Sequence, residues 1–145
     1  YGVHPDMISH SGMTMKMGHG VINSGSTKQK INTRCSTTAE LVAVDDYASI
    51  MLWTRHFLLA QGYDVRTILE QDNQSTVKLH KNGRWSSSKR TRHMNIKYIF
   101  MKDQVDNKNI EVEYCPTESI TSDYMTKPLV GEKFYHFKAD IMNIP

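Results

Sequence analysis

The spacing of the apolar residues changes near Thr37, and this change restricts the chain to folds that combine strands with helices. Before that point, Met13, Met15 and Met17 alternate with polar residues, which is the pattern of a half-buried strand. A period of two followed by a period of about 3.6 residues predicts a hairpin that precedes a long helix. The helical spacing extends to Gln61-Gly62 and involves Leu41, Val44, Ala48, Met51 or Leu52, and Phe57 or Leu58.

The remaining segments continue this mixture of strands and helices. Residues 1–11 have the composition of a loop, and residues 13–33 that of a hairpin with two or three strands, broken at Gly18-His19-Gly20 and by a turn at residues 23–26. Further strands are predicted at residues 65–71 and 109–115, and further helices at residues 74–79, 91–105 and 123–141, the last interrupted around Pro128 and Gly131. The 91–105 helix is expected to bury Ile96 with Ile99 or Phe100, and Met101 is a further candidate for the same face. This order indicates an α/β fold in which helices cover a mixed sheet.

Length and composition narrow the classes of protein. A length of 145 residues suits one domain, so we treat residues 1–145 as a single domain. A net charge of +3 permits a polyanionic partner without requiring one. The two cysteines, Cys35 and Cys115, form no CxxC pair and no dense cysteine framework, so neither a zinc ribbon nor a disulfide scaffold is supported, and a reducing compartment is expected. No apolar run reaches the roughly 18 residues that a membrane-spanning helix needs, so no membrane partner is expected.

Three acidic residues lie where predicted elements begin or end. Asp72 follows the 65–71 strand, Glu40 lies near the start of the long helix, and Asp123 opens the last helical segment. Carboxylates that different elements bring together are the hard oxygen ligands that Mg²⁺ requires. These three residues are therefore candidate metal ligands.

Each acid also has a purely structural interpretation. Glu40 lies three residues after Thr37, which is the spacing of a capping box. Asp72 could cap a helix that begins near Asn73. Asp123 could be a first-turn acid that interacts favourably with the helix dipole. Taken singly, the three positions leave both interpretations open.

Six segments form an ordered set of motifs. They are Val3-His4-Pro5-Asp6 followed by Ser9-His10-Ser11-Gly12, Ser36-Thr37-Thr38-Ala39-Glu40, Gln71-Asp72-Asn73-Gln74-Ser75, Thr91-Arg92-His93-Met94-Asn95-Ile96-Lys97-Tyr98, Glu113-Tyr114-Cys115-Pro116-Thr117 and Asp123-Tyr124-Met125-Thr126-Lys127-Pro128-Leu129. With this order and these spacings, the chain resembles, over essentially its whole length, the ribonuclease H domain that closes the Pol polyprotein of copia-type LTR retrotransposons.

This resemblance implies a ribonuclease H-like fold, with a mixed five-stranded sheet flanked by helices. It also implies a reaction, the metal-dependent endonucleolytic hydrolysis of the RNA strand of RNA–DNA hybrids during reverse transcription. The family's catalytic metal ligands fall on Glu40, Asp72 and Asp123. The implied cofactor is Mg²⁺, with two ions about 4 Å apart in an intact domain and Mn²⁺ as the alternative metal.

The resemblance has a gap at its N-terminal side. Proteins of this family use a fourth carboxylate, an aspartate on the first strand, which in copia-type domains lies a few residues before the segment that matches Tyr1-Gly2-Val3-His4. Asp6 matches the turn beyond that strand and is not expected to replace it. We therefore expect residues 1–145 to form a domain that is incomplete at the N-terminus, lacks most of the first strand and is inactive by itself.

Basic residues are expected to contact nucleic acid, because positive side chains release counterions when they bind backbone phosphates. The expected partners are the RNA–DNA hybrid and the upstream reverse transcriptase domain of the same polyprotein. The implied location is the cytoplasmic virus-like particle, with the nucleus as an alternative. A solvated surface, or local packing in the case of the histidine, is the structural alternative for these side chains. The candidate nucleic-acid-binding residues are Lys89, Arg90, Arg92, His93 and Lys127.

A second class of function is also open. A ribonuclease H-like fold without catalysis could act as a nucleic-acid-binding or interaction module, using the basic segment at residues 89–102 and no metal. The two functions differ in whether the three carboxylates are needed. Substitution of one carboxylate therefore discriminates between them.

Overall fold

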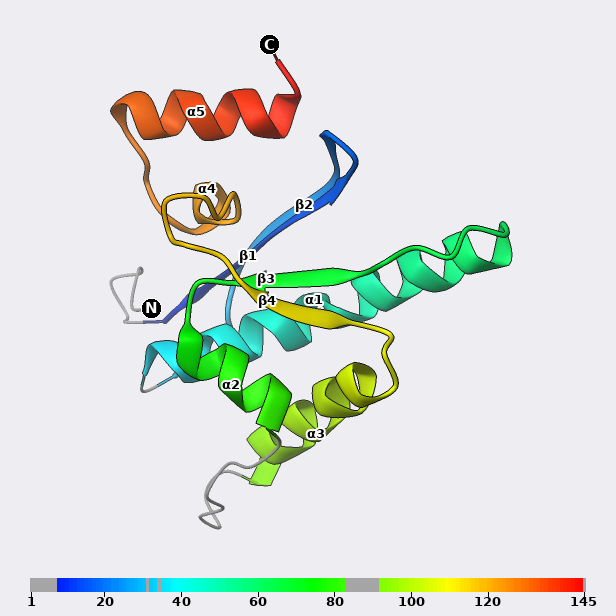
Figure 1. Ribbon diagram of the computed structural model, residues 1–145. Coiled ribbons are helices and arrows are strands. Elements are labelled where there is room, and N and C mark those ends of the chain that lie inside the picture. Colours follow the sequence, from blue (N-terminus) through cyan, green and yellow to red (C-terminus); the bar gives the residue numbers. More distant parts are fainter. Residues whose placement is uncertain (1–7, 31, 34, 83–91, 145) are drawn as a thin grey trace. The chain divides into compact units, whose positions relative to one another are not determined.

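The computed structural model describes residues 8–30, 32–33, 35–82 and 92–144, which form four strands and five helices (Figure 1). The chain divides into two compact units. The first unit comprises Tyr1–Ala43 and Thr117–Pro145, and the second unit comprises Val44–Pro116. The first unit is therefore assembled from two separate parts of the sequence, and the second unit from the part between them.

The first unit is built on an antiparallel hairpin. β1 (His10–Met17) pairs with β2 (Gly20–Lys28), and the register shifts at a bulge between Met15 and Lys16. Gly18 in the connecting turn has a φ of +61°, a left-handed conformation that glycine adopts without steric cost. The predicted strand and the break after it are thus confirmed, with the turn at Gly18 and His19. The predicted alternation of burial is wrong, because Thr14 is half-buried like Met13 and Met15, and Met17 is 46% exposed.

Two predicted boundaries of the hairpin are wrong. β1 starts at His10, inside the predicted loop, and β2 continues through residues 23–26, where the sequence predicts a turn. Ser24 pairs with Thr14 and Gly25 with Met13, so the hydrogen bonds of the ladder outweigh the turn preference of small polar residues. The described residues between Lys28 and α1 add no third strand.

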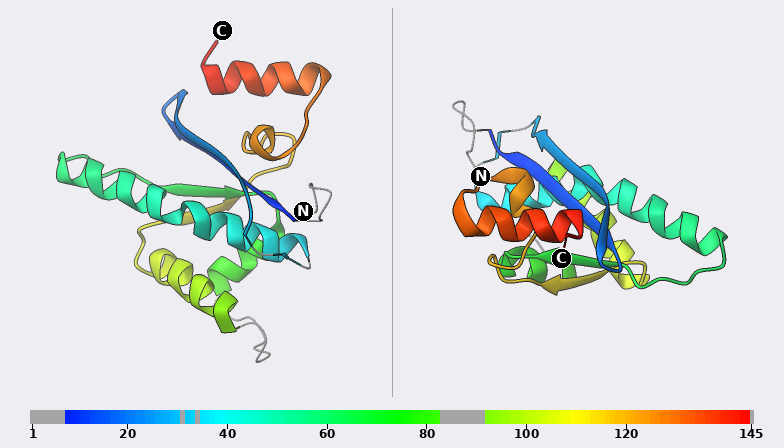
Figure 2. Two further views of the ribbon diagram at one scale, coloured as in Figure 1. Left: turned by 180° about the vertical axis from the view of Figure 1, so that it is seen from behind. Right: turned by 90° about the horizontal axis from the view of Figure 1, so that it is seen from above.

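Two helices from the C-terminal part of the chain pack on this hairpin (Figure 2). α4 (Asp123–Thr126) contacts both strands, and α5 (Gly131–Met142) contacts β2 and α4. The chain is not helical between them, which confirms the interruption predicted around Pro128 and Gly131. Phe137 of α5 is 1% exposed and anchors this helix.

A charged contact fastens α5 to the hairpin. The Lys16 ammonium group pairs with the Asp140 carboxylate, and Thr121 Oγ1 donates a hydrogen bond to the same carboxylate at 2.9 Å. The hydrogen bond from Lys16 lowers the pKa of Asp140. Asp140 therefore links β1, the segment before α4, and α5.

α1 (Ser36–Ala60) is the long helix that the sequence predicts. From Val44 onward it belongs to the second unit, where Val44, Ala48 and Leu52 are buried at the expected spacing of four residues. Phe57, by contrast, is 49% exposed and stacks on Trp53 with ring centroids 5.4 Å apart. Of the two predicted alternatives, Leu58 is therefore the partly buried residue and Phe57 is not. Among the described residues, the buried core cluster includes no residue of α1 beyond Leu52.

The second unit also contains a parallel strand pair (Figure 1). β3 (Ile68–Gln71) pairs with β4 (Glu111–Tyr114), and the chain between them forms α2 (Gln74–Asn82) and α3 (Arg92–Asp106). α2 contacts both strands and α3. Because the pairing is parallel, the carboxyl ends of the two strands lie together, with Gln71 opposite Tyr114.

Residues from three helices and β4 form the core of the second unit. On α3 the core-facing residues are Tyr98 and Met101, whereas Ile99 and Phe100 are 55% and 41% exposed. The expected burial of Met101 is therefore confirmed and that of Ile99 or Phe100 is wrong, because a shift of one residue on a helix turns the side chain by about 100°. The side chain of Ile96 lies outside the described part of the chain. The buried cluster consists of Val44, Ala48, Leu52, Val77, Met101, Ile110 and Val112.

The sheets differ in size from the expectation. The described strands form two sheets of two strands each, one antiparallel and one parallel, and not a single five-stranded sheet. Within the described residues, β1 and β3 each have one neighbouring strand. The mixed α/β character of the fold is as predicted.

Candidate functional site

Among the predicted site residues with described side chains, Asp123 is the most enclosed. It is the first residue of α4 and is 6% exposed. The Lys127 Nζ atom lies 2.8 Å from each of its two carboxylate oxygens. Lys133 Nζ lies 3.5 Å from Oδ2 of the same carboxylate. A carboxylate removed from water needs such partners, because desolvation disfavours an unpaired charge.

Lys133 has no counterpart among the predicted site residues. Its ammonium group also donates a hydrogen bond to the Thr117 carbonyl oxygen at 3.4 Å and lies 5.3 Å from the centroid of the Phe137 ring. Lys133 belongs to α5, whereas Asp123 belongs to α4, so no spacing rule within one helix relates the two residues. Packing of the two helices creates this contact.

Close contact with the hairpin holds α4 in place. A Cβ atom at Gly12 would lie 2.4 Å from Thr126 Cγ2 and 3.0 Å from Met125 Cβ, so only the absence of a side chain lets β1 come this near to α4. Ser26 Oγ of β2 donates a hydrogen bond to the Met125 carbonyl oxygen at 2.6 Å. Both strands therefore fix the helix that carries Asp123.

Glu40 is the fifth residue of α1 and is partly buried. The helix begins at Ser36, and the Ala39 amide donates to the Cys35 carbonyl oxygen at 3.1 Å, which puts Cys35 at the N-cap position. Thr37 therefore lies inside the helix. A capping box formed by Thr37 and Glu40 would need Thr37 at the N-cap position, which Cys35 occupies. The capping-box interpretation of Glu40 is therefore wrong.

Asp72 directly follows the carboxyl end of β3, as predicted, and is partly buried. The next residue caps α2, since Asn73 Oδ1 accepts hydrogen bonds from the Ser75 amide at 2.9 Å and from the Thr76 amide at 3.3 Å. The Asn73 carbonyl oxygen accepts the first helical hydrogen bond, from Val77 at 3.0 Å. Asn73 thus occupies the N-cap position, and the interpretation of Asp72 as that cap is wrong.

The three carboxylates come from different units. Glu40 and Asp123 belong to the first unit, and Asp72 belongs to the second. Among the described residues, no group of three or more His, Cys, Asp or Glu side chains is arranged to hold a metal ion. The chemistry of the donors fits Mg²⁺ or Mn²⁺, which prefer carboxylate oxygens. The cations that contact Asp123 in this structure are the ammonium groups of Lys127 and Lys133.

The predicted nucleic-acid-binding residues are described only in part. Lys89 and Arg90 lie outside the described residues. Arg92 and His93 are the first two residues of α3, so the predicted helix is confirmed at this position. Lys127 is described, and its ammonium group contacts Asp123. The sequence prediction of a phosphate-binding segment therefore stays a prediction.

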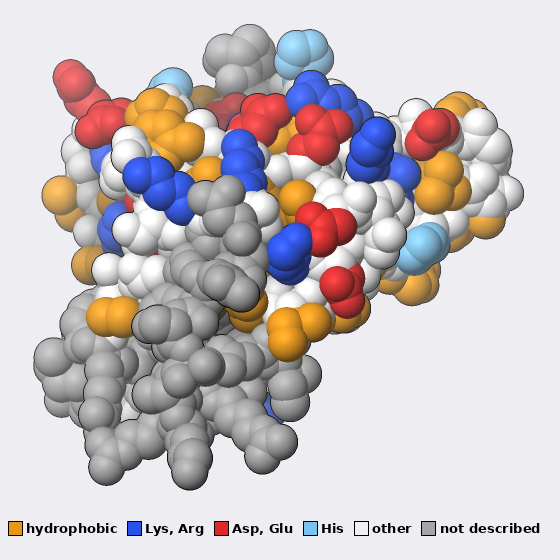
Figure 3. Space-filling view, turned by 60° about the horizontal axis from the view of Figure 1, so that its bottom comes forward, with side chains coloured by type: hydrophobic (Ala, Val, Ile, Leu, Met, Phe, Trp, Pro, Cys, Tyr) orange, Lys and Arg blue, Asp and Glu red, His pale blue; other side chains and the backbone are white. Residues whose placement is uncertain are grey.

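The described surface carries mixed charge. On the face drawn in Figure 3, Lys and Arg side chains lie beside Asp and Glu side chains. Two large aromatic residues, Trp53 in the C-terminal half of α1 and Tyr63 just after the helix, are 65% and 64% exposed. None of the described helices combines the length and the apolar character that crossing a bilayer requires.

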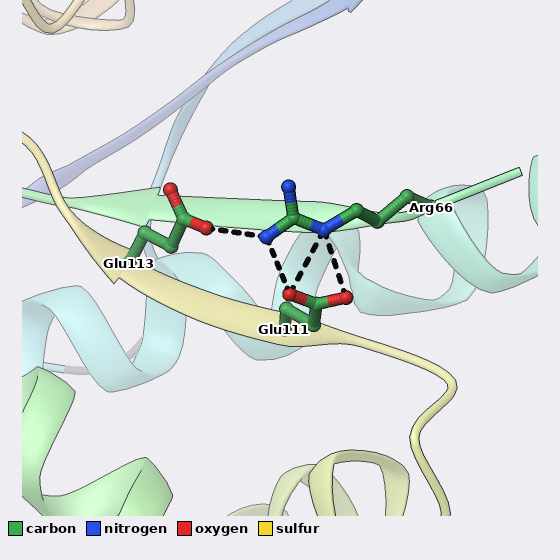
Figure 4. A network of polar contacts seen from close by, with 3 residues as sticks. All are labelled: Arg66, Glu111 and Glu113. Carbon is green, nitrogen blue, oxygen red and sulfur yellow. Dashed lines mark hydrogen bonds and ion pairs between the residues drawn. The ribbon is translucent and has the colours of Figure 1, made fainter.

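An ion-pair network spans the β3–β4 pair (Figure 4). Arg66 Nε lies 2.9 Å and 3.0 Å from the two Glu111 carboxylate oxygens, and Arg66 Nη2 lies 2.8 Å from Glu113 Oε1. The hydrogen bonds from Arg66 lower the pKa of Glu111. All three side chains are exposed, so the network is expected to add little to stability. The signal in the sequence is the spacing of two between Glu111 and Glu113, which puts both on one face of β4.

His80 is a buried polar residue that the sequence pattern does not reveal. Its ring is 1% exposed and lies 6.5 Å from the Tyr98 ring, centroid to centroid. Neither ring nitrogen has a hydrogen-bond partner in the described part of the chain. Burial lowers the pKa of His80 to about 4. The side chain is therefore neutral at pH 7 and fills the contact between α2 and α3.

Comparison with known proteins places the relatives of this chain among retrotransposon polyproteins. The chain is 31% identical over 142 residues to the Retrovirus-related Pol polyprotein from transposon RE1 of Arabidopsis thaliana, and 28% identical over 127 residues to that from transposon TNT 1-94 of Nicotiana tabacum. It is 29% identical over 137 residues to the Transposon Ty1-NL2 Gag-Pol polyprotein of Saccharomyces cerevisiae. No family model matches the chain. No solved structure matches it.

These matches cover most of this chain and a small part of each relative. The alignments to the RE1, TNT 1-94 and Ty1-NL2 polyproteins include 97%, 87% and 92% of the chain. The chain spans 10%, 9% and 8% of the length of these relatives. Its homologues are thus Pol and Gag-Pol polyproteins of retrotransposons, and it corresponds to about one tenth of such a polyprotein.

Proposed function

We propose that this chain is the ribonuclease H part of a retrotransposon Pol polyprotein, and that the ribonuclease H domain to which residues 1–145 contribute hydrolyses the RNA strand of RNA–DNA hybrids. The observation that supports this most is the buried Asp123 carboxylate, held with its cationic partners on a helix that two strands fix, in a chain whose homologues are Pol polyproteins. Burial of a carboxylate is costly, and carboxylates that proteins keep in this state are often functional.

In this proposal Glu40, Asp72 and Asp123 hold Mg²⁺, or Mn²⁺ in its place. When bound, the metal supplies a water molecule of lowered pKa and neutralises charge on the phosphodiester. The protein contributes rigid attachment for each carboxylate, on α1, at the end of β3 and on α4. Asn73 performs the capping of α2, which leaves Asp72 without that structural task.

Lys127 and Lys133 have a role in the same proposal. Their ammonium groups neutralise Asp123 in this structure. Once Asp123 contacts a different cation, the two ammonium groups no longer need to neutralise it. Lysine side chains are point charges on flexible stems, so they could then turn to phosphates of the hybrid. The proposed setting is a polyprotein that includes the reverse transcriptase, within cytoplasmic virus-like particles.

A second candidate is a non-catalytic nucleic-acid-binding or interaction module. The pairing of Asp123 with two lysines favours it, because this arrangement is complete without a metal ion. In that case Asp123 is a structural residue that fastens α4 to α5 through Lys133. The two candidates predict opposite results for substitution of a carboxylate that contributes little to the fold.

The test measures Mg²⁺-dependent cleavage of a labelled RNA–DNA hybrid by residues 1–145, alone and joined to any residues encoded before Tyr1. Asp72→Asn is compared with Glu70→Gln, an isosteric neutralisation of an exposed acid on β3. We expect Asp72→Asn to reduce cleavage roughly a hundredfold or more and Glu70→Gln to leave it unchanged.

Each outcome decides between the candidates. In the form that cleaves the hybrid, cleavage by Asp72→Asn at the rate of the unaltered protein would refute the proposed mechanism. Binding of the hybrid without cleavage by every form, including the extended one, would support the non-catalytic module. Loss of cleavage in Asp72→Asn together with unchanged binding of the hybrid is the result that the proposed enzyme requires.

A further inference from the structure

The side chain of Gln29 joins β1 to the start of α1. Gln29 follows β2 directly and is 3% exposed. Its Nε2 atom lies 2.7 Å from the Ala39 carbonyl oxygen and 3.1 Å from Ser11 Oγ. Its backbone amide donates to the Ser9 carbonyl oxygen at 2.9 Å. One residue therefore contacts both the strand and the helix.

The Ala39 carbonyl group determines which way the Gln29 amide faces. A carbonyl oxygen can only accept, so the atom 2.7 Å away must be the donor nitrogen and not the amide oxygen. The two N–H groups then serve Ala39 and Ser11. The remaining atom, Gln29 Oε1, is buried and has no hydrogen-bond partner among the described residues. A buried acceptor without a partner is unfavourable. We infer that the two hydrogen bonds donated by the N–H groups offset this cost, and that they are the reason for a glutamine here.

This amide acts on two elements of the candidate site. Ala39 directly precedes Glu40 in the first turns of α1. Ser11 is fully buried in β1 and is the neighbour of Gly12. At Gly12, β1 contacts α4, the helix that begins with Asp123. A second buried contact, between Ser9 Oγ and Thr33 Oγ1 at 3.0 Å, attaches the segment before α1 to the same end of the hairpin.

We propose that Gln29 is a positioning residue for the candidate metal site. Its amide fixes the first turns of α1, which carry Glu40, to the strand on which the helix of Asp123 packs. This inference rests on the proposed function, because it takes Glu40 and Asp123 as metal ligands. Gln29 itself touches neither metal nor substrate in this role.

The test uses residues 1–145 with three substitutions in both measurements, and Glu40→Gln is added for the second. Gln29→Leu removes both N–H donors and the unpaired oxygen while it keeps most of the volume. Ser11→Ala removes one of the two hydrogen bonds and is the milder variant if Gln29→Leu does not fold. Gln104→Leu is the matched control, because Gln104 Oε1 accepts a hydrogen bond from Asn109 at 3.0 Å within the second unit, to which α1 residues 36–43 do not belong.

The first measurement is amide hydrogen exchange at residues 39–43, which does not depend on catalysis. We expect exchange to accelerate roughly tenfold in Gln29→Leu, by a smaller factor in Ser11→Ala, and not at all in Gln104→Leu. Exchange in residues 48–60 of α1 is expected to stay unchanged in all three. Equal exchange at residues 39–43 in Gln29→Leu and the unaltered protein would overturn the inference.

The second measurement is the binding of Mn²⁺, followed by the electron paramagnetic resonance signal of the free ion. We expect Gln29→Leu to weaken binding roughly fivefold to tenfold, Glu40→Gln to weaken it more, and Gln104→Leu to have no effect. Unchanged binding in Gln29→Leu with weakened binding in Glu40→Gln overturns the positioning role and leaves the proposed function intact. Unchanged binding in Glu40→Gln means that the proposed metal site is wrong, and the positioning role falls with it.

Discussion

Acidification is expected to destabilise the second unit through His80. The buried ring has a pKa of about 4, compared with an ordinary value of 6.5. Between these values the unfolded chain binds a proton and the folded chain does not, so stability falls as the pH falls. A difference of 2.5 pKa units corresponds to about 3 kcal/mol in the free energy of unfolding. This part of the stability is fully present above pH 6.5 and is lost by about pH 4.

His80→Leu removes this titration. Leucine has a similar volume and no ring nitrogen to leave unpaired, so the variant is expected to be at least as stable as the unaltered protein at pH 7.5. The difference in the free energy of unfolding between the variant and the unaltered protein should then grow by about 1.4 kcal/mol for each pH unit below 6.5. The matched control is His19→Leu in the exposed turn of the hairpin, which is expected to follow the unaltered protein.

The assay is equilibrium unfolding in urea at several pH values, followed by tryptophan fluorescence. Trp53 and Trp85 both lie within the sequence of the second unit, so the signal reports on that unit. Parallel stability curves for His80→Leu and the unaltered protein between pH 7.5 and 4.5 would refute this account of His80. A lower stability of His80→Leu at pH 7.5 would show that the ring nitrogens do have a favourable partner.

Three further substitutions test the packing around the candidate residues. Gly12→Ala is expected to lower the free energy of unfolding by about 1–3 kcal/mol, because the new Cβ would overlap Thr126. The control is Gly20→Ala, whose Cβ would meet no atom within 4 Å. Thermal unfolding followed by circular dichroism compares the two variants. Asn73→Ala is expected to cost about 1 kcal/mol through loss of the α2 cap, and equal stability of Asn73→Ala and the unaltered protein in urea would contradict that role. Lys133→Met is expected to lower the free energy of unfolding by about 1 kcal/mol, because Asp123 loses one cationic partner. Thermal unfolding compares this variant with Lys138→Met, which alters an exposed lysine. An identical midpoint for both would mean that Lys127 alone neutralises Asp123.

Local patterns were sufficient for the order of the elements. The helical spacing of Val44, Ala48 and Leu52 predicts α1, and the alternation of Met13, Met15 and Met17 predicts β1. Both patterns are periodic along a single element, so a few consecutive residues contain the information. For the same reason the sequence places Asp72 correctly at the end of β3.

Local patterns were not sufficient for the faces and ends of the elements. The sequence offers Ile99 or Phe100, together with Met101, as core residues of α3, but Met101 is buried with Tyr98 instead. Tyr98 and Met101 are three residues apart and share one helix face, and packing against α2 selects that face. The polar segment at residues 23–26 has the composition of a turn, yet its pairing with β1 keeps it extended.

The sequence by itself determined the succession of strands and helices, the breaks between them, and the positions of Glu40, Asp72 and Asp123 near element ends. Only the tertiary structure decided how these residues are surrounded: Lys133 beside Asp123, Gly12 against Thr126, and the Gln29 amide on the Ala39 carbonyl group. The hydrophobic periodicity of an element and the capping of a helix each involve only a few consecutive residues, so both can be predicted from the sequence. Neutralisation of a buried charge and close approach of two backbones join residues from different elements, and these contacts exist only once the elements have packed.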